Sequence, residues 1–144
     1  MQVYTDGSDI QGRVGAAAWY AHKNWSPMVD IGPSDTFTVY GAELIGIWLA
    51  LMMAIRNGSR VKRLTVYTDN QAAILSTIRP REQSGQVILG MISRAINILH
   101  QRNVIITLRW IPAHIGVPGN EQVDLFAKQA TGWRKKGQIG GRRG

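Results

Sequence analysis

The sequence predicts a mixed α/β fold in which one five-stranded sheet carries helices on both faces. Three short β-patterned segments open the chain, and strand and helix patterns then alternate from about residue 40 onward. Strand, helix and strand in succession imply right-handed crossovers and parallel pairing, whereas short strands joined by polar turns imply an antiparallel meander. We therefore expect strands 1 to 3 to be antiparallel and strands 1, 4 and 5 to be parallel.

The first part of the chain has three strand patterns. Residues 2–5 form a short β-branched run, and Asp6-Gly7-Ser8 directly after it is typical of a turn. Residues 14–22 and 25–31 have the composition of a second and a third strand, with a polar turn at Lys23-Asn24 between them. These segments predict the antiparallel part of the sheet.

A long helix is predicted over residues 40–56, where apolar residues keep helical spacing and Asn57-Gly58 supplies a stop. The segment is apolar on most of its faces, as expected for a helix buried across a sheet. Residues 60–68 then predict the fourth strand, and residues 69–78 a short helix that Asp69 can cap.

The last part of the chain repeats this alternation. Residues 86–100 predict a helix, and residues 104–110 a strand dense in β-branched side chains. A final helix is expected over residues 120–131, with Asn120 as its cap and Glu121 in its first turn. Together with the earlier elements, these segments complete the five-stranded sheet.

Composition excludes several classes of site. With 144 residues, 44% of them apolar, the chain fits one folded domain with a real core. The lack of cysteine excludes disulfides, thiolate zinc sites and cysteine nucleophiles. Residues 44–55 are the longest apolar run, too short to span a bilayer, and the start of the chain lacks the layout of a signal peptide. We expect a soluble intracellular monomer with no membrane partner, and the composition leaves open whether it is nuclear or cytoplasmic.

The charge of the chain favours a polyanionic partner. Five of its eight net positive charges lie in the glycine-rich residues 133–144, at Arg134, Lys135, Lys136, Arg142 and Arg143. We expect this basic tail to be disordered and residues 1–132 to form the domain. The remaining body is mildly basic, so nucleic acid is the expected partner, bound by phosphate neutralisation.

Four of the nine acidic residues lie where the predicted fold could bring them together: Asp6, Glu43, Asp69 and Asp124. Asp6 and Asp69 follow parallel strands, and ligands collect outside the carboxyl ends of such strands. Converging acids repel one another unless cations neutralise them. Carboxylate oxygens suit Mg²⁺ or Mn²⁺, and two such ions can hold an in-line phosphoryl displacement. The first functional hypothesis is a metal-dependent nuclease.

Each of these acids also has a purely structural interpretation. Asp6 could form a turn, Asp69 could cap a helix, and Glu43 could favour the N-terminal end of a helix dipole. The tryptophans of the body fit packing better than base stacking, whereas Trp133 could stack on nucleic acid or be unconstrained. It is the four acids together that favour a common site.

The motifs around these acids resemble those of type 1 ribonuclease H over nearly the whole chain. The matching segments are Tyr4-Thr5-Asp6-Gly7-Ser8, Ala42-Glu43-Leu44, Tyr67-Thr68-Asp69-Asn70-Gln71, Trp110-Ile111-Pro112-Ala113-His114 and Gly119-Asn120-Glu121-Gln122-Val123-Asp124. Their order carries the resemblance, because each motif alone is weak. The loop after Trp110 is most similar to ribonuclease H domains attached to reverse transcriptases of retrotransposons, especially those of the non-LTR class.

The resemblance implies a ribonuclease H-like fold and hydrolysis of the RNA strand of an RNA–DNA hybrid, leaving 5′-phosphate and 3′-hydroxyl ends. It implies two Mg²⁺ ions, with Mn²⁺ as a possible substitute. The implied metal ligands are Asp6, Glu43, Asp69 and Asp124, with Asp6 as the bridge; His114 would assist proton transfer or product release; Gly7, Ser8, Asn70 and Gln71 would contact substrate.

Two departures from the family pattern bear on substrate binding. Cellular relatives often carry polar amides just before the helix glutamate, whereas this chain has Val39 and Tyr40 there. The connection over residues 79–86 is also too short for the extra basic helix of some bacterial members. We therefore expect affinity to come from elsewhere, such as the basic tail.

Two other functions compete with the nuclease. A scaffold domain could keep the fold and bind nucleic acid without catalysis, as connection domains of some reverse transcriptases do, although the intact four acids argue against it. A transposase or integrase shares the fold but uses a different acidic set, and its DNA strand transfer would distinguish it. The chain starts almost directly on its first strand, which fits a domain covalently linked to a reverse transcriptase in a retroelement polyprotein.

Overall fold

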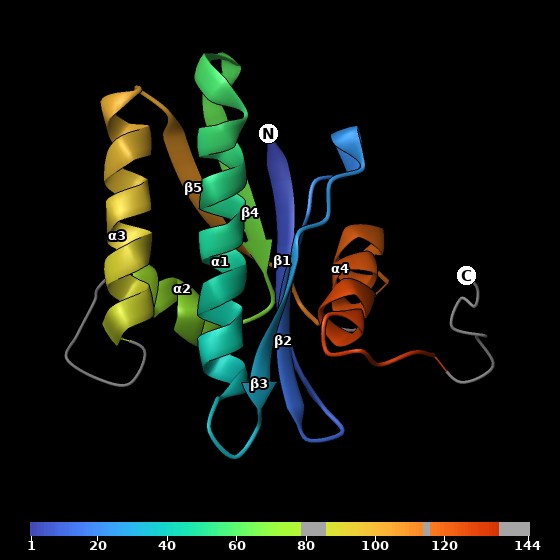
Figure 1. Ribbon diagram of the computed structural model, residues 1–144. Helices are drawn as coiled ribbons and strands as arrows, with labels where there is room; N and C mark the ends of the chain where they lie inside the picture. Colours follow the sequence, from blue (N-terminus) through green and yellow to red (C-terminus); the bar gives the residue numbers. More distant parts are fainter. Residues whose placement is uncertain (79–85, 114–115, 136–144) are drawn as a thin grey trace.

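The structure, a computed structural model, describes residues 1–78, 86–113 and 116–135. A five-stranded sheet with the order β3-β2-β1-β4-β5 forms its centre (Figure 1). The strands are β1 (Gln2–Ile10), β2 (Arg13–Trp19), β3 (Met28–Pro33), β4 (Arg63–Thr68) and β5 (Ile105–Trp110). The α-helices are α1 (Val39–Arg56), α2 (Gln71–Ile78), α3 (Gln86–Gln101) and α4 (Pro118–Gln129), and two short 3-10 helices are η1 (Ala21–Lys23) and η2 (Gly58–Arg60).

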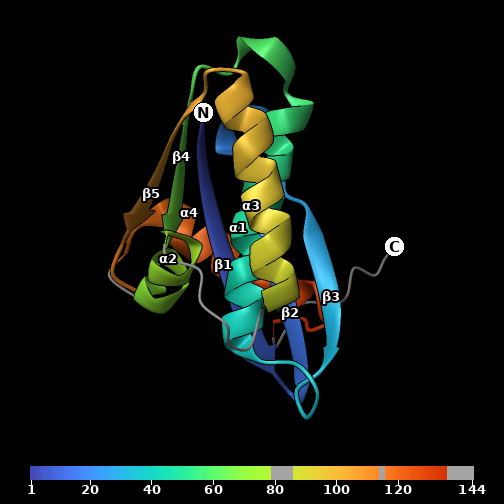
Figure 2. The ribbon, with the colours of Figure 1, turned by 90° about the vertical axis from the view of Figure 1, so that its left-hand side faces the viewer.

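Strand pairing confirms the predicted fold class. β1 pairs with β2 and β2 with β3 in the antiparallel sense, while β4 pairs in parallel with both β1 and β5. Helices α1, α2 and α3 lie on one face of the sheet and α4 lies on the other (Figures 1 and 2). The mixed sheet with helices on both faces is therefore the ribonuclease H-like arrangement.

The predicted end of the first strand is wrong. β1 continues through Asp6, Gly7 and Ser8 as far as Ile10, and its pairing with β2 runs without a break from Tyr4 to Ile10. The turn comes later, at residues 11–12, where consecutive positive φ angles of 52° and 79° give the backbone of a tight hairpin. The ladder with β2 overrides the local turn signal, so Asp6 lies inside a strand.

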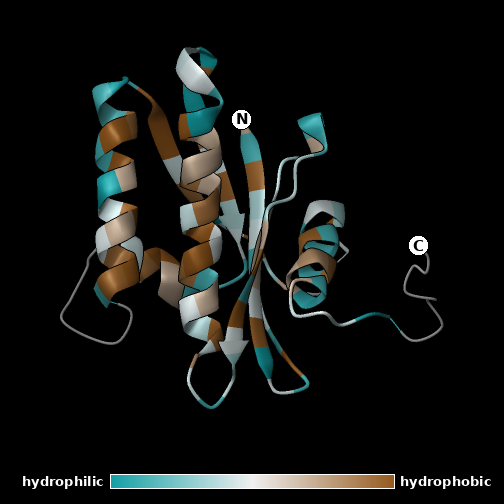
Figure 3. Cartoon of the chain, viewed as in Figure 1, coloured by the Kyte–Doolittle hydropathy of each residue, from teal (hydrophilic) through white to brown (hydrophobic). Residues whose placement is uncertain are grey.

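Helix α1 is the centre of the core. It is eighteen residues long with a mean hydropathy of 1.5, enough by length and composition to cross a membrane, but 56% of it is buried inside the fold, as in the core helix of a globular protein. Figure 3 shows hydrophobic residues along α1 and along the strands behind it. The largest fully buried side chains are Leu44, Ile47, Leu51 and Met53 of α1, Val3, Val14, Leu64 and Val66 of the sheet, Leu89, Ile92 and Leu99 of α3, and Val123 of α4.

Two glycines allow α1 to approach β1 closely. A Cβ atom on Gly7 would lie 2.7 Å from both the Cβ of Ala42 and the backbone nitrogen of Glu43. A Cβ on Gly46 would lie 3.3 Å from the carbonyl oxygen of Asp6. The contacts at Gly7 leave no room for a side chain and those at Gly46 are tight, so the missing Cβ atoms let the first turns of α1 lie directly on β1.

Two predicted helix caps are corrected. Asn70, not Asp69, caps α2, because its Oδ1 accepts a hydrogen bond of 2.8 Å from the backbone nitrogen of Ala73. Asn120 does not cap α4, which begins two residues earlier at Pro118. Proline suits the first helical position, since its φ is already helical and it has no N–H to satisfy. The predicted stop of α1 is confirmed at Asn57, and Gly58 follows with a φ of +82°.

Candidate active site

Asp6 and Asp69 meet because of the register between two parallel strands. The pairing of β1 with β4 runs from Gln2 to Tyr4, and Tyr4 is opposite Tyr67. Asp6 and Asp69 each lie two residues beyond that pair, Asp6 within β1 and Asp69 directly after β4. Equal offsets from a common pair bring two acids that are distant in sequence to the same level of the sheet.

Glu43 joins the two aspartates from helix α1. Its position in the first turns of the helix, together with the close approach at Gly7, brings its carboxylate to the same point. One carboxylate oxygen from each of Asp6, Glu43 and Asp69 lies within 4.8 Å of the others. We call these three residues the acidic triad.

Burial and mutual repulsion raise the pKa values of two members of the triad. Asp6 is 4% exposed and Glu43 is 3% exposed. Burial is the main cause of the raised pKa of Asp6, followed by the charge of Glu43, a hydrogen bond with Glu43, the charge of Asp69 and a hydrogen bond with Asp124. Burial also raises the pKa of Glu43, while hydrogen bonds with Asp6, the Gly7 N–H and the Thr68 hydroxyl oppose this rise. Without a cation, the folded protein therefore retains protons at this site.

Asp124 lies beside the triad, on α4. It hydrogen-bonds Asp6, yet its side chain is 28% exposed and forms a 3.0 Å ion pair with Lys128 one turn later. The Lys128 ammonium in turn lies 5.7 Å from the ring centroid of Trp133. The fourth acid is thus at the edge of the site, between Asp6 and a lysine.

The chemistry of this donor set fits a divalent cation with hard oxygen ligands. The three carboxylate oxygens lie within 4.8 Å of one another, and adjacent oxygens around one octahedral Mg²⁺ at 2.0–2.1 Å are about 3 Å apart, so the three side chains would move closer together around a shared ion. The charge of such an ion would replace the protons that the raised pKa values of Asp6 and Glu43 indicate. Burial, spacing and charge therefore all favour Mg²⁺-type binding.

The residues predicted to contact substrate lie around the triad in different settings. Gly7 faces α1 at its closest approach, and Ser8 is 7% exposed within β1. Asn70 uses its Oδ1 as the cap of α2, and Gln71 is exposed at the first position of that helix. His114 lies outside the described residues.

Three residues that hold the site in place were not anticipated from the sequence. The Thr68 hydroxyl donates to Oε2 of Glu43 at 3.4 Å, and Nε1 of Trp110 donates to the carbonyl oxygen of Asp69 at 3.2 Å. Lys128 pairs with Asp124. Only Lys128 had a signal in the sequence, because residues four apart on a helix are neighbours; the other two contacts depend on the pairing of strands.

Val39 and Tyr40, which precede Glu43 on α1, differ in exposure and contacts. Val39 is 43% exposed at the first turn of α1, which Thr38 caps by accepting a 3.0 Å hydrogen bond from Gly41. Tyr40 is turned toward α2, where its hydroxyl forms a short hydrogen bond with Ser76. Tyr40 thus connects two helices, and the side chain left exposed beside the site is the apolar Val39.

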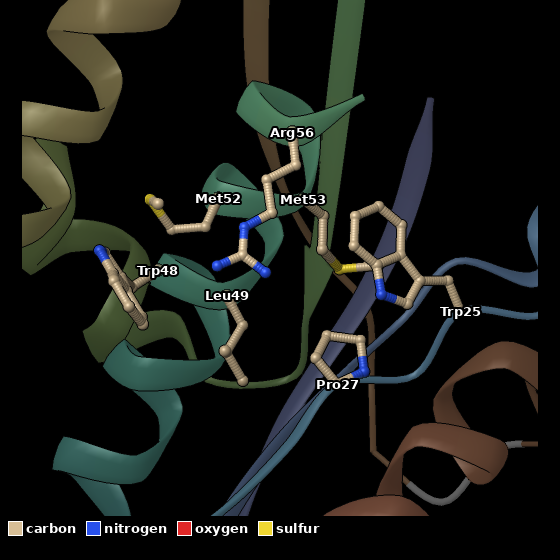
Figure 4. A pocket seen from close by; sticks show the side chains of 7 residues that line it. All are labelled: Trp25, Pro27, Trp48, Leu49, Met52, Met53 and Arg56. Carbon is tan, nitrogen blue, oxygen red and sulfur yellow. The ribbon is translucent and has the colours of Figure 1, made fainter. Parts of the chain in front are cut away.

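An apolar groove of about 110 Å³ is present elsewhere in the described chain (Figure 4). Its walls come from α1 and from the segment before β3, and they consist of Trp25, Pro27, Trp48, Leu49, Met52, Met53 and Arg56. None of these residues belongs to the acidic triad or carries a carboxylate. The groove therefore makes no contribution to the candidate metal centre.

Comparison with known proteins agrees with the fold and the motifs. The family model described as RNase H matches residues 1–132. Among solved structures, the chain is similar to RNase H1 from the halophilic archaeon Halobacterium salinarum NRC-1, with a TM-score of 0.63 and 18% sequence identity over 90% of this chain and 95% of that one. At this identity the structural match shows the shared fold, while the family model covers nearly the whole sequence. The chain belongs to the RNase H family and is a hydrolase of the ribonuclease H type.

Proposed function

We propose that this protein is a metal-dependent endonuclease that cleaves the RNA strand of RNA–DNA hybrids and leaves 5′-phosphate and 3′-hydroxyl ends. The observation that carries the proposal is the acidic triad, in which three carboxylates converge within 4.8 Å and two of them are buried. Repulsion among three converging carboxylates destabilises the fold unless cations bind between them, and such cations can in turn bind a phosphodiester.

The four acids would form the ligand set for two Mg²⁺ ions. Asp6 interacts electrostatically with each of the others, since Glu43, Asp69 and Asp124 all contribute to its raised pKa. We therefore propose that Asp6 would be shared between two ions and that Glu43, Asp69 and Asp124 would supply the other protein ligands. When bound, the ions would orient and activate water and stabilise the leaving 3′ oxygen.

The chain's own residues would keep this ligand set in place. The Gly7 N–H and the Thr68 hydroxyl orient the Glu43 carboxylate, and the Trp110 indole holds the backbone at Asp69. The Lys128 ammonium neutralises Asp124 until an ion replaces it. Preorganisation of this kind lowers the reorganisation needed when substrate binds.

Substrate contacts complete the proposal. We assign proton transfer or product release to His114, because histidine is the residue type that most readily exchanges protons near neutral pH. We assign contacts with ribose or phosphate to Gly7, Ser8, Asn70 and Gln71. Asn70 keeps its side-chain amide N–H groups for this purpose, because the cap of α2 uses its oxygen. Selection of RNA requires reading of 2′-hydroxyls across a minor groove.

We also propose that residues 1–132 are the catalytic domain, followed by a basic tail, and that the domain belongs to a retroelement reverse transcriptase. The motif around Trp110 and the segment from Gly119 to Asp124 support this origin. The alternative function is a scaffold domain that binds hybrid without cutting it. The convergence of the acidic triad favours the nuclease, because a scaffold gains nothing from buried, mutually repelling acids.

The test is cleavage of defined substrates by the purified full chain. Strand-labelled RNA–DNA hybrid is compared with RNA duplex, DNA duplex and single strands, each with Mg²⁺, Mn²⁺ or EDTA. The proposal predicts metal-dependent cutting of the hybridised RNA alone. Cutting of DNA or joining of DNA strands would support a transposase-like function instead, and hybrid binding without cutting in any metal would support the scaffold.

A further inference from the structure

A second charged surface lies at the end of the sheet away from the acidic triad. Its concave centre, with a volume of about 440 Å³, is lined by four exposed cations. They are Lys23 of η1, Arg60 of η2, Lys62 directly before β4 and Arg63 at its start. We call this surface the basic end; it lies at the top of Figure 1, where the last turn of α1 and the N-terminus are also found.

The basic end has no compensating negative charge among the described residues. Within this part of the chain, no aspartate or glutamate lines it, and none of its four cations forms an ion pair there, whereas Arg13 and Lys128 elsewhere do. Arg56 and Arg102 flank it and add to the charge. The C-terminus of α1 contributes only about half a negative charge through its dipole, so most of this positive charge is unbalanced.

Hydrogen bonds hold one of the four cations and one neighbouring arginine in place. Nζ of Lys23 donates to Oδ1 of Asn57 at 3.0 Å, and the Arg102 guanidinium donates to the carbonyl oxygen of Ile55 at 2.8 Å. Both contacts connect separate segments to the end of α1. Among the four cations, Lys23 is therefore tied to the end of α1, which lowers the entropy that this side chain loses when an anion binds.

The basic end is distinct from the candidate active site. Asp69 is six residues beyond Arg63 along the β4 direction, which corresponds to about 20 Å. Glu43 and Arg56 are thirteen residues apart on α1, which again corresponds to about 20 Å. Such a separation equals about six phosphates along one strand of a duplex, so the two sites can act on different stretches of nucleic acid.

We propose that the basic end binds the phosphate backbone of nucleic acid outside the stretch held at the acidic triad. The cations come from two segments, Lys23 and residues 60–63, and spread over an open surface, which suits a row of phosphates better than one small anion. Arginine also matches phosphate oxygens with two parallel donors. The inference extends the proposed function, on which it rests for the class of ligand, and places part of the affinity in the folded body.

The test compares two variants of the full chain that lose the same charge at different places. Arg60→Gln with Lys62→Gln alters the basic end, and Arg13→Gln with Arg94→Gln is the matched control on other exposed surfaces. Fluorescence anisotropy measures binding of a labelled 24-base-pair hybrid in EDTA between roughly 50 and 200 mM salt. Binding without metal separates this surface from cleavage at the triad.

The proposal predicts that the basic-end variant binds about 10-fold more weakly than the control at low salt. Its slope of log affinity against log salt should fall by about 2, at roughly 0.9 for each phosphate that is no longer neutralised on a duplex. Equal effects in both variants would mean that only net charge matters, and would overturn the proposal. Binding of a poly-glutamate probe is measured in the same way. If Arg60→Gln with Lys62→Gln weakens binding of poly-glutamate but not of the hybrid, the proposal is overturned in favour of an acidic protein partner.

Cleavage assays keep this proposal separate from the proposed function. If the wild-type chain does not cut hybrid, but mutation of the basic end reduces the salt dependence of hybrid binding, this inference is retained and the nuclease is rejected. If the wild-type chain cuts hybrid and the basic-end variant binds hybrid with an unchanged salt slope, this inference is rejected and the nuclease is retained.

Discussion

The substitution Asp6→Asn is expected to make the metal-free protein more stable, with an effect that grows with pH. In the folded chain the pKa of Asp6 is raised from 3.8 to about 11 by burial and by the neighbouring acids. Folding therefore requires this carboxyl to keep its proton at neutral pH, while the unfolded chain releases it. Asparagine has nearly the same shape and needs no proton.

The size of the effect follows from the proton balance. A group with a raised folded pKa costs about 1.4 kcal/mol for each pH unit above its unfolded pKa, until pH passes the folded value. From 3.8 to pH 8, the limit for Asp6 is about 6 kcal/mol. Solvent that reaches Asp69, a half-buried neighbour, screens part of this repulsion. We expect about 3 kcal/mol at pH 8 and almost no difference at pH 4.

Chemical denaturation in EDTA, followed by circular dichroism from pH 4 to 8, measures this difference. The control is Asp9→Asn, which removes an exposed carboxylate from the same strand. The Asp6→Asn variant should also gain about 10 °C in Tm at pH 8, and Mg²⁺ should stabilise it less than it stabilises the wild type. An Asp6→Asn variant no more stable than wild type at pH 8, or a gain that does not widen with pH, would refute this reasoning.

Three further predictions address the surroundings of the site. Lys128→Met should release Asp124 and raise the affinity for Mn²⁺ by about 3-fold in calorimetry, a modest effect because the ion pair is partly exposed. Weaker Mn²⁺ binding would contradict the idea that Lys128 competes with the ion for Asp124. Gly7→Ala should lower the free energy of unfolding in urea by about 1–3 kcal/mol, because the new Cβ would lie 2.7 Å from atoms of α1. An unchanged midpoint would show that α1 can shift to make room for it. Deletion of residues after Gly132 should flatten the salt dependence of hybrid binding by about 0.9 for each phosphate that the tail neutralises, whereas an unchanged slope would assign all of this binding to the folded body.

The order and type of the elements could be predicted from the sequence because apolar spacing is a local property. Residues 40–56 have the composition of a buried helix, and α1 spans Val39–Arg56. The course of β1 could not be predicted in the same way. Asp6-Gly7-Ser8 has the composition of a turn, and only the ladder with β2, which becomes evident in the folded chain, keeps it extended.

The candidate site was likewise predictable from the sequence only in part. The contexts of Asp6, Glu43 and Asp69 indicated a common site, and the structure brings these three together. Which neighbour caps α2 was not decided by sequence, since Asp69 and Asn70 are both good caps and helix ends vary by one or two residues. The basic end could be found only in part from the sequence, because Arg60, Lys62 and Arg63 are neighbours along the chain but only the fold brings Lys23 beside them.

If the four acids hold divalent cations for cleavage of RNA in a hybrid, loss of one of these carboxylates should abolish cleavage, whereas loss of an exposed carboxylate should not. The rate of Mg²⁺-dependent cleavage of labelled hybrid RNA is compared for the wild type, Asp69→Asn and the exposed control Asp9→Asn, each shown to be folded. The account predicts that Asp69→Asn loses at least about 100-fold in rate and that Asp9→Asn stays within about 2-fold of wild type. Cleavage by Asp69→Asn at the wild-type rate would contradict it.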